Sequence, residues 1–318
     1  MDISAWLVSG ALPAAIAAGA CWLSYWLAGS GCCAGAHAAE PLPTESTGPE
    51  LTGPDLAGAS SRRGRLAPAV LGLGWAVAVA AALIGQRHLA GDESSHWWPE
   101  DFWQRGYWWL LIAAVTLSAT AWAAFAGSSA RWVAAGVLAM GTAAGSLPTG
   151  AGREDTFPLH AGWGLLLGSA CLLAFWSLDR LARRRSERWF PLVVLAMLAG
   201  PMLVAATTYG ALVQWTIAAI AATLVCVIAA LAGRLPGGIG IAYPAAAFFT
   251  VLMAAGRFYS YEDHPWWSYL GLLLLAPAVS SVDRLIARRG TGLRAMVAAG
   301  VAAALIAASA AWHLRDLQ

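Results

Sequence analysis

The amino-acid sequence predicts an all-α protein, a polytopic integral membrane bundle of about ten transmembrane helices. Three observations predict it: 59% of the 318 residues are apolar, 11% are charged, and the mean hydropathy is +0.62. Soluble domains have about 45–50% apolar and about 25% charged residues, so these values exclude an ordinary soluble protein. The formal net charge of +2 provides no strongly basic surface, and we expect no nucleic-acid partner.

The candidate spans are apolar stretches near the length of about 20 residues that a transmembrane helix needs. They lie near residues 4–28, 67–85, 107–126, 131–147, 161–178, 189–209, 211–232, 241–257, 266–282 and 293–312. The stretches at 131–147 and 241–257 are near the minimum length and contain glycines or Pro244, so eight or nine spans are an alternative.

The chain divides into three parts by composition. Residues 1–29 predict an N-terminal transmembrane helix, which we expect to be an uncleaved anchor, because no basic residue precedes the apolar stretch. Residues 30–66 are rich in Gly, Pro and Ser and predict a disordered cytoplasmic linker. Residues 67–318 predict the membrane-embedded helical bundle.

Arginine placement predicts the orientation, since cytoplasmic loops carry the basic excess. The chain has no lysine, and ten alternating spans put 14 of the 19 arginines on one side and 5 on the other. We expect the richer side to be cytoplasmic, which places both termini outside. The prediction is a multi-pass protein of the inner, cytoplasmic membrane of a bacterium.

A weak internal repeat indicates tandem helical hairpins. Residues 177–185 (SLDRLARRR) and 281–289 (SVDRLIARR) agree at six of nine positions. Each follows an apolar stretch that an acidic pair precedes, at 154–155 and at 262–263. Two hairpins in the same orientation would be a parallel repeat. The alternative is chance similarity between short helices that end in arginines.

The interior of the predicted spans holds no charged residue, although such residues usually mark a coupling site. Asp179 and Asp283 lie at helix ends beside arginines, where boundary ion pairs are the expected role. Pro201, Pro244 and Pro277 are expected to interrupt helices, as in transporters that line a cavity. Polar side chains around the turn between the sixth and seventh spans are the candidate cavity lining: Thr208, Tyr209, Gln214 and Thr216.

Histidines and acidic residues gather on the predicted outer side. Imidazole and carboxylate groups are the usual ligands of zinc and similar metals. Two compact groups are candidate ligands of one metal site: His160 with Glu154 and Asp155, and His264 with Glu262 and Asp263. Their spacing matches no local metal-binding motif. The alternative is that these residues are solvated loop side chains, and no cofactor can be named.

The chain is rich in tryptophan, with 18 residues. Several lie near the predicted outer boundary, among them Trp98, Trp163, Trp266 and Trp312. Indole rings favour the headgroup level, so an aromatic belt explains them. A stacking surface for a sugar, quinone or lipid headgroup is the alternative.

Three functions are consistent with these features. The span count, the prolines and the lack of buried charge favour a permease-like transporter of a small neutral or amphipathic molecule. A non-catalytic accessory or scaffold subunit, with a membrane-protein partner or as a homo-oligomer in the bilayer, is the second. The third is an outer-face enzyme that depends on a metal or a lipid-linked sugar. Nucleophile-elbow, Walker-type and Asp-rich magnesium motifs are absent from the sequence, which favours a non-enzymatic role.

Overall fold

The computed structural model describes residues 7–32, 54–89, 108–109, 111–112, 115, 128–147, 157–183, 190–208, 210–232, 238–259, 266–289 and 291–315. Every regular element in these residues is helical, which confirms the all-α prediction. In chain order the elements are the π-helical turn η1 (Leu7–Ala11), α2 (Leu12–Cys32), α3 (Pro54–Leu89), α5 (Ser128–Ser146), α6 (Phe157–Arg183), α7 (Phe190–Thr208), α8 (Gly210–Leu231), the 3-10 turn η4 (Gly238–Ile241), α9 (Ala242–Tyr259), α10 (Trp266–Leu273), α11 (Leu275–Leu285) and α12 (Thr291–Arg315).

Five of the described helices contain a segment long and apolar enough to cross a membrane. These segments are Leu7–Leu27, Leu66–Gln86, Ala161–Ala182, Leu212–Leu231 and Met296–His313. Three shorter apolar segments are Trp132–Ser146, Phe190–Leu203 and Ala242–Phe258. All eight coincide with predicted spans. The predicted span at 107–126 lies almost wholly outside the described residues.

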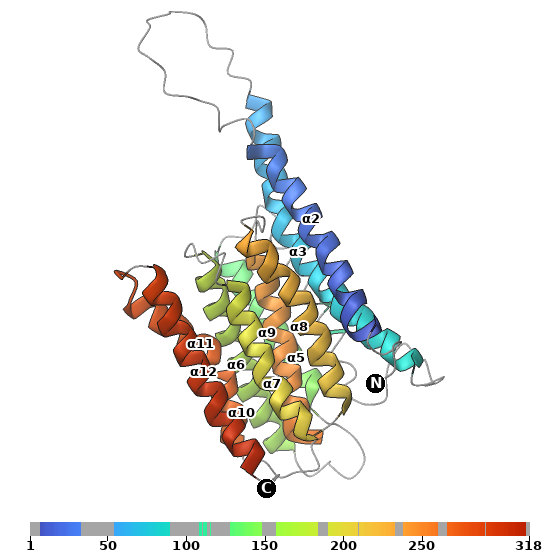
Figure 1. Ribbon diagram of the computed structural model, residues 1–318, viewed down its shortest axis with the longest axis vertical. Coiled ribbons are helices and arrows are strands. Elements are labelled where there is room, and N and C mark those ends of the chain that lie inside the picture. Colours follow the sequence, from blue (N-terminus) through green and yellow to red (C-terminus); the bar gives the residue numbers. More distant parts are fainter. Residues whose placement is uncertain are drawn as a thin grey trace, which may run out of the picture.

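The helices form one bundle, from which the α2–α3 pair projects at one end (Figure 1). We call the end where α6 begins and α9 ends the acidic-loop end, because in the sequence acidic pairs precede α6 and follow α9. The opposite end, where α6 ends at Arg183, is the arginine end. Because α2 begins and α12 ends on the acidic-loop side, the described chain starts and finishes at the same end. Which side of a membrane that end faces stays a prediction.

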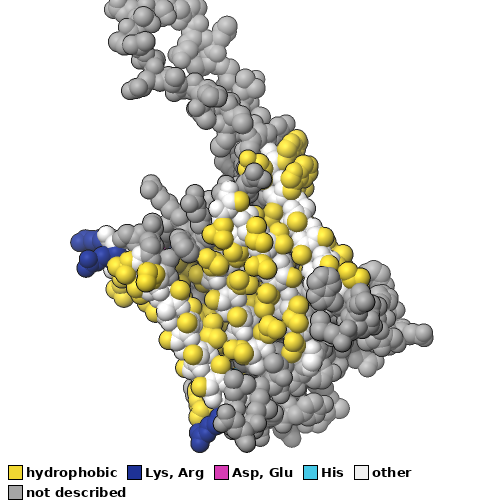
Figure 2. Space-filling view, in the orientation of Figure 1, with side chains coloured by type: hydrophobic (Ala, Val, Ile, Leu, Met, Phe, Trp, Pro, Cys, Tyr) yellow, Lys and Arg dark blue, Asp and Glu magenta, His cyan; other side chains and the backbone are white. Residues whose placement is uncertain are grey.

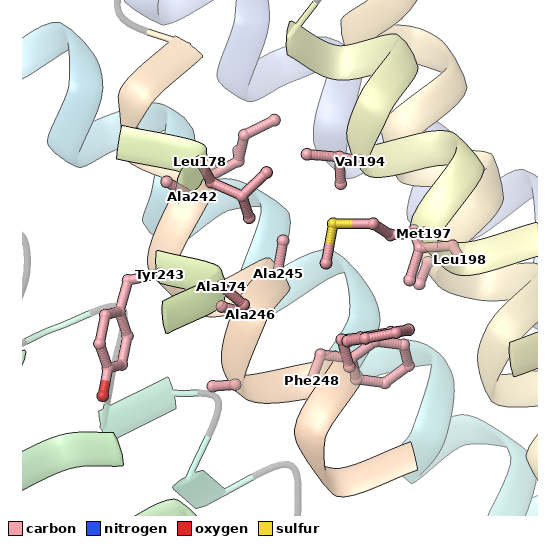
Figure 3. Packing of buried hydrophobic residues seen from close by; sticks show 14 of the residues in the cluster. Ala174, Leu178, Val194, Met197, Leu198, Ala242, Tyr243, Ala245, Ala246 and Phe248 are labelled. Carbon is pink, nitrogen blue, oxygen red and sulfur yellow. The ribbon is translucent and has the colours of Figure 1, made fainter. Parts of the chain in front are cut away.

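Helix α9 is enclosed in the middle of the bundle. It packs against α5, α6 and α7, and every residue from Ile241 to Gly256 is buried. Figure 3 shows Ala245, Ala246 and Phe248 of α9 between side chains of α6 and α7. Small residues such as these alanines let helix backbones approach closely, which is how membrane helices gain packing energy without help from water.

Hydrogen bonds between helices add to this packing. Trp75 of α3 donates its Nε1 proton to Thr223 Oγ1 of α8 over 3.0 Å. Tyr243 of α9 donates its hydroxyl to the Ala135 carbonyl of α5, also over 3.0 Å. Ser24 of α2 donates to a carbonyl of α3 over 2.7 Å. Each such bond pairs a polar group that would otherwise be unsatisfied in an apolar interior.

The backbone of α3 touches η4 at two glycines. A Cβ atom built on Gly72 would overlap the carbonyl oxygen of Gly240, and one built on Gly240 would overlap the carbonyl oxygen of Pro68. Only residues without a side chain allow two backbones to lie this close. The contact between Gly72 and Gly240 therefore fixes the position of α3 against η4, the turn that precedes α9.

The structure differs from the sequence-based expectations at the linker and at two prolines. Helix α3 begins at Pro54, so the C-terminal part of the predicted 30–66 linker is helical. Pro201 lies inside a helix, as predicted, but α7 continues across it from Phe190 to Thr208 without an interruption. Pro244 does not interrupt α9, because it occupies the first turn, where a missing N–H costs least.

The last predicted span is two helices, α10 and α11, divided at Leu274. Pro277 explains this break, because it has no N–H to donate to the carbonyl four residues earlier, at Leu273. The two hairpins of the proposed repeat, α5–α6 and α9 with α10–α11, run in the same directions between the two ends. Helix α6, in contrast, is continuous, so the hairpins are not identical.

An ion pair joins α11 to α12 at the arginine end. Arg294 donates from Nε and Nη2 to Asp283 Oδ1, over 2.9 and 2.5 Å. Asp283 therefore has the boundary ion-pair role that its position beside arginines predicts. Asp179, its counterpart in the repeat, is also buried at this end.

Candidate functional site

The predicted metal site is not tested by the described residues. Glu154, Asp155, Glu262, Asp263 and His264 lie outside them, and His160 is placed only as a backbone position in the first turn of α6. Within the part of the chain that the structure describes, no three His, Cys, Asp or Glu side chains come together as metal ligands. The metal site stays a prediction.

The side chains of only two residues of the predicted mid-membrane cavity lining are described. Gln214 is exposed on α8, whereas Thr216 is buried and donates its hydroxyl to the Leu212 carbonyl of its own helix over 2.8 Å. Thr208 ends α7 without a described side chain, and Tyr209 lies outside the described residues. The cavity lining stays a prediction.

A pocket that the sequence did not predict lies at the acidic-loop end. We call it the end pocket. Its volume is about 20 Å³, room for about one water molecule. Three helices contribute its lining: Trp163, Leu166 and Leu167 from α6, Met253, Arg257 and Phe258 from α9, and Tyr269 and Leu273 from α10.

Arg257 supplies the charge of the end pocket. It lies in the last turn of α9, with its guanidinium carbon 5.9 Å from the centre of the Trp163 ring. Its Nε is buried and has no hydrogen-bond partner among the described residues. A buried guanidinium N–H without an acceptor costs free energy, so this position favours an oxygen ligand.

Aromatic rings form the walls around this arginine. Trp163 and Phe258 meet edge to face, with ring centres 5.5 Å apart and planes at 89°. The Tyr269 hydroxyl donates to the Gly256 carbonyl over 2.9 Å, which holds α10 against the end of α9. Behind Tyr269, the fully buried His313 of α12 packs with its ring centre 5.5 Å away.

On the surface, exposed arginines lie at the ends of the bundle and apolar residues lie between them. Figure 2 shows arginines at the two ends of the visible face and a broad apolar band between them. The exposed arginines include Arg284, Arg288 and Arg289 at the arginine end, and Arg315 at the acidic-loop end. Indole rings accompany the latter, since Trp267 and Trp312 lie 4.5 Å apart between ring centres and Arg315 lies over Trp312. This arrangement is typical of a bilayer-embedded protein with an aromatic boundary.

Sequence reasoning missed the fully buried His313 and the partly buried Arg257, whose Nε is enclosed. Both were counted only as polar residues of the outer side. The available signal was their placement, because each lies within the last residues of an apolar helix and not in a loop.

Comparisons of the chain with protein-family models, curated proteins and solved structures find no match in any of the three.

Proposed function

We propose that the chain is a non-enzymatic integral membrane protein that binds a small amphipathic molecule at the end pocket. The observation that carries this proposal is the meeting of one guanidinium, aromatic edges and apolar side chains from three helices in one depression. Ligand sites in proteins are mostly apolar, with a few polar groups that orient the ligand. The proposal keeps the amphipathic ligand class that the sequence favours.

The size and position of the end pocket favour a ligand that only partly enters it. The pocket has room for about one water molecule, so a small polar group fits and a sugar or nucleotide does not. Leu166 of the lining is 40% exposed, so the pocket opens on the surface of the bundle. The apolar remainder of the ligand would lie along α6 and α10 within the bilayer.

The proposal does not include passage through the middle of the described bundle. Thr216, Thr223 and Thr250 each donate to the carbonyl four residues earlier in their own helix, over 2.7–2.9 Å. With α9 enclosed, a passage between these helices would require packed surfaces to separate. Permease-like transport would gain support from flux of a labelled amphiphile in proteoliposomes that a blocked end pocket abolishes.

Photolabelling tests the proposal on the full chain in an uncharged detergent. The probes are two diazirine-bearing amphiphiles with the same alkyl chain, one with a phosphate and one with a glycerol headgroup. We expect at least one of them to label peptides of α6 and α10, and Leu166→Trp to block the labelling. The matched control is Leu165→Trp, because Leu165 is exposed on the same helix but does not line the pocket. Equal labelling of both variants and wild type would refute the proposal.

A non-catalytic scaffold subunit is the second candidate, favoured by the enclosed α9. Native mass spectrometry of the detergent-extracted protein tests it. A discrete homo-oligomer would support this function, whereas a monomer whose end pocket is labelled would contradict it.

A further inference from the structure

We propose that Arg257 makes the end pocket a receptor for an oxyanion, the phosphate of an anionic lipid headgroup, whose acyl chain lies on the apolar lining. This inference rests on the proposed function and names its ligand class.

The guanidinium of Arg257 has an enclosed N–H donor without a described acceptor. A guanidinium has five N–H donors, all in its plane, and no acceptor. The guanidinium carbon of Arg257 lies over the Trp163 ring, 5.9 Å from the ring centre, and this ring offers no oxygen acceptor to the N–H groups. Nε is enclosed without a partner among the described residues. A ligand with two adjacent oxygens, which arginine binds as a fork, would supply the acceptor that Nε lacks.

The described residues place no carboxylate near the guanidinium of Arg257. The described carboxylates with placed side chains are Asp179 and Asp283, and both lie at the arginine end, at the other end of the bundle. The hydroxyl proton of Tyr269 is already donated to Gly256, so this group does not compete for the anion as a donor. Within the described residues the positive charge of Arg257 has no counterion.

The lining and position of the end pocket favour a lipid over a free anion. Besides Arg257, the lining is aliphatic or aromatic, and it opens beside the exposed Leu166. Arg257 lies in the last turn of an apolar helix, the depth at which headgroups meet the end of a span. A phosphate that arrives with its own acyl chain covers both the charge and the apolar lining, whereas inorganic phosphate covers only the charge.

The experiment compares the phosphate and glycerol probes on wild type, Arg257→Gln and Arg257→Lys. In wild type we expect the phosphate probe to bind about ten- to a hundredfold more tightly, the range for hydrogen bonds to a charged group. Arg257→Gln should bring the ratio of the two probe affinities to about one, and Arg257→Lys should restore part of the preference for the phosphate probe. The matched control is Arg315→Gln at the same end, because Arg315 is exposed and does not line the pocket.

Each other outcome overturns a defined part of the inference. Equal binding of both probes to wild type, or an unchanged preference in Arg257→Gln, refutes the oxyanion site while the amphiphile-binding function stands. If neither probe binds, the proposed function fails and the inference fails with it. Displacement of the phosphate probe by millimolar inorganic phosphate overturns the lipid as the source. If the phosphate probe binds only after the double substitution Glu262→Gln with Asp263→Asn, the chain's own carboxylates fill the site. That outcome overturns the inference.

Discussion

Gly72→Ala tests the closest approach of two backbones in this bundle. The new Cβ would overlap the carbonyl oxygen of Gly240 in η4, a backbone atom that no rotamer change can move. Overpacking of this kind costs about 1–3 kcal/mol, and a backbone contact belongs at the upper end of that range. Alanine returns about 1 kcal/mol through helix propensity. The expected net result is a loss of about 2 kcal/mol in the free energy of unfolding.

The matched control is Gly136→Ala in α5. A Cβ on Gly136 meets no atom within 4 Å, so only the helix-propensity gain of up to about 1 kcal/mol applies. The same chemical change should therefore have opposite signs at the two positions, with a difference of about 3 kcal/mol.

Unfolding by added sodium dodecyl sulphate in a mild detergent, followed by near-ultraviolet circular dichroism, measures both variants against wild type. Because the two variants add the same methyl group, any general effect of alanine on micelle binding cancels in their difference. Gly72→Ala as stable as Gly136→Ala would refute the crossing of α3 over η4. The double variant Gly72→Ala with Gly240→Ala should be less stable still, since Gly240 also lacks room for a Cβ, against Pro68.

Two further predictions concern cysteines and histidines. The thiols of Cys21 in α2 and Cys226 in α8 lie 3.8 Å apart, so copper–phenanthroline should oxidise them to a disulfide. After cleavage at a protease site inserted between the two cysteines in the sequence, this disulfide should hold the two fragments together on a non-reducing gel. Cys21→Ser should abolish the link, and Cys171→Ser should keep it. If the predicted metal site exists, the purified protein should hold stoichiometric zinc, manganese or iron that His160→Ala with His264→Ala removes, and a metal-free wild type would contradict a tightly bound centre.

The helices could be predicted because hydropathy and length report them directly. A run such as 211–232 is apolar and uncharged, and its described helix α8 covers Gly210–Leu231. The interruption near Pro277 was also predictable, since a proline removes a specific backbone bond. The beginning of α3 at Pro54 was not, because residues 54–66 have the small and polar composition of a linker. Composition reports burial well and helix ends poorly.

The end pocket could not be predicted because its neighbours come from distant parts of the chain. Trp163, Arg257 and Tyr269 belong to three helices, and the sequence records only that each lies near the end of an apolar stretch. The repeat analysis came closest, since it paired the hairpins that supply these residues. It directed attention to the acidic residues and histidines of the loops, whereas the charge of the end pocket belongs to Arg257, five residues before Glu262 in the sequence.

The hydrogen bonds of the polar side chains indicate where a ligand can bind to this bundle. In the middle, hydroxyl groups such as that of Thr250 donate within their own helix, and Tyr243 and Trp75 donate to fixed partners on neighbouring helices. For these groups a new contact would replace one already made. The described hydroxyls without a partner, those of Thr142 and Ser177, are fully buried and offer no opening to a ligand. At the acidic-loop end, Arg257 has donors still to be satisfied beside an open apolar surface. Binding there gains free energy without disturbing the packed core, and so an amphiphile held at the end of the bundle accounts for these contacts better than a solute passing through it.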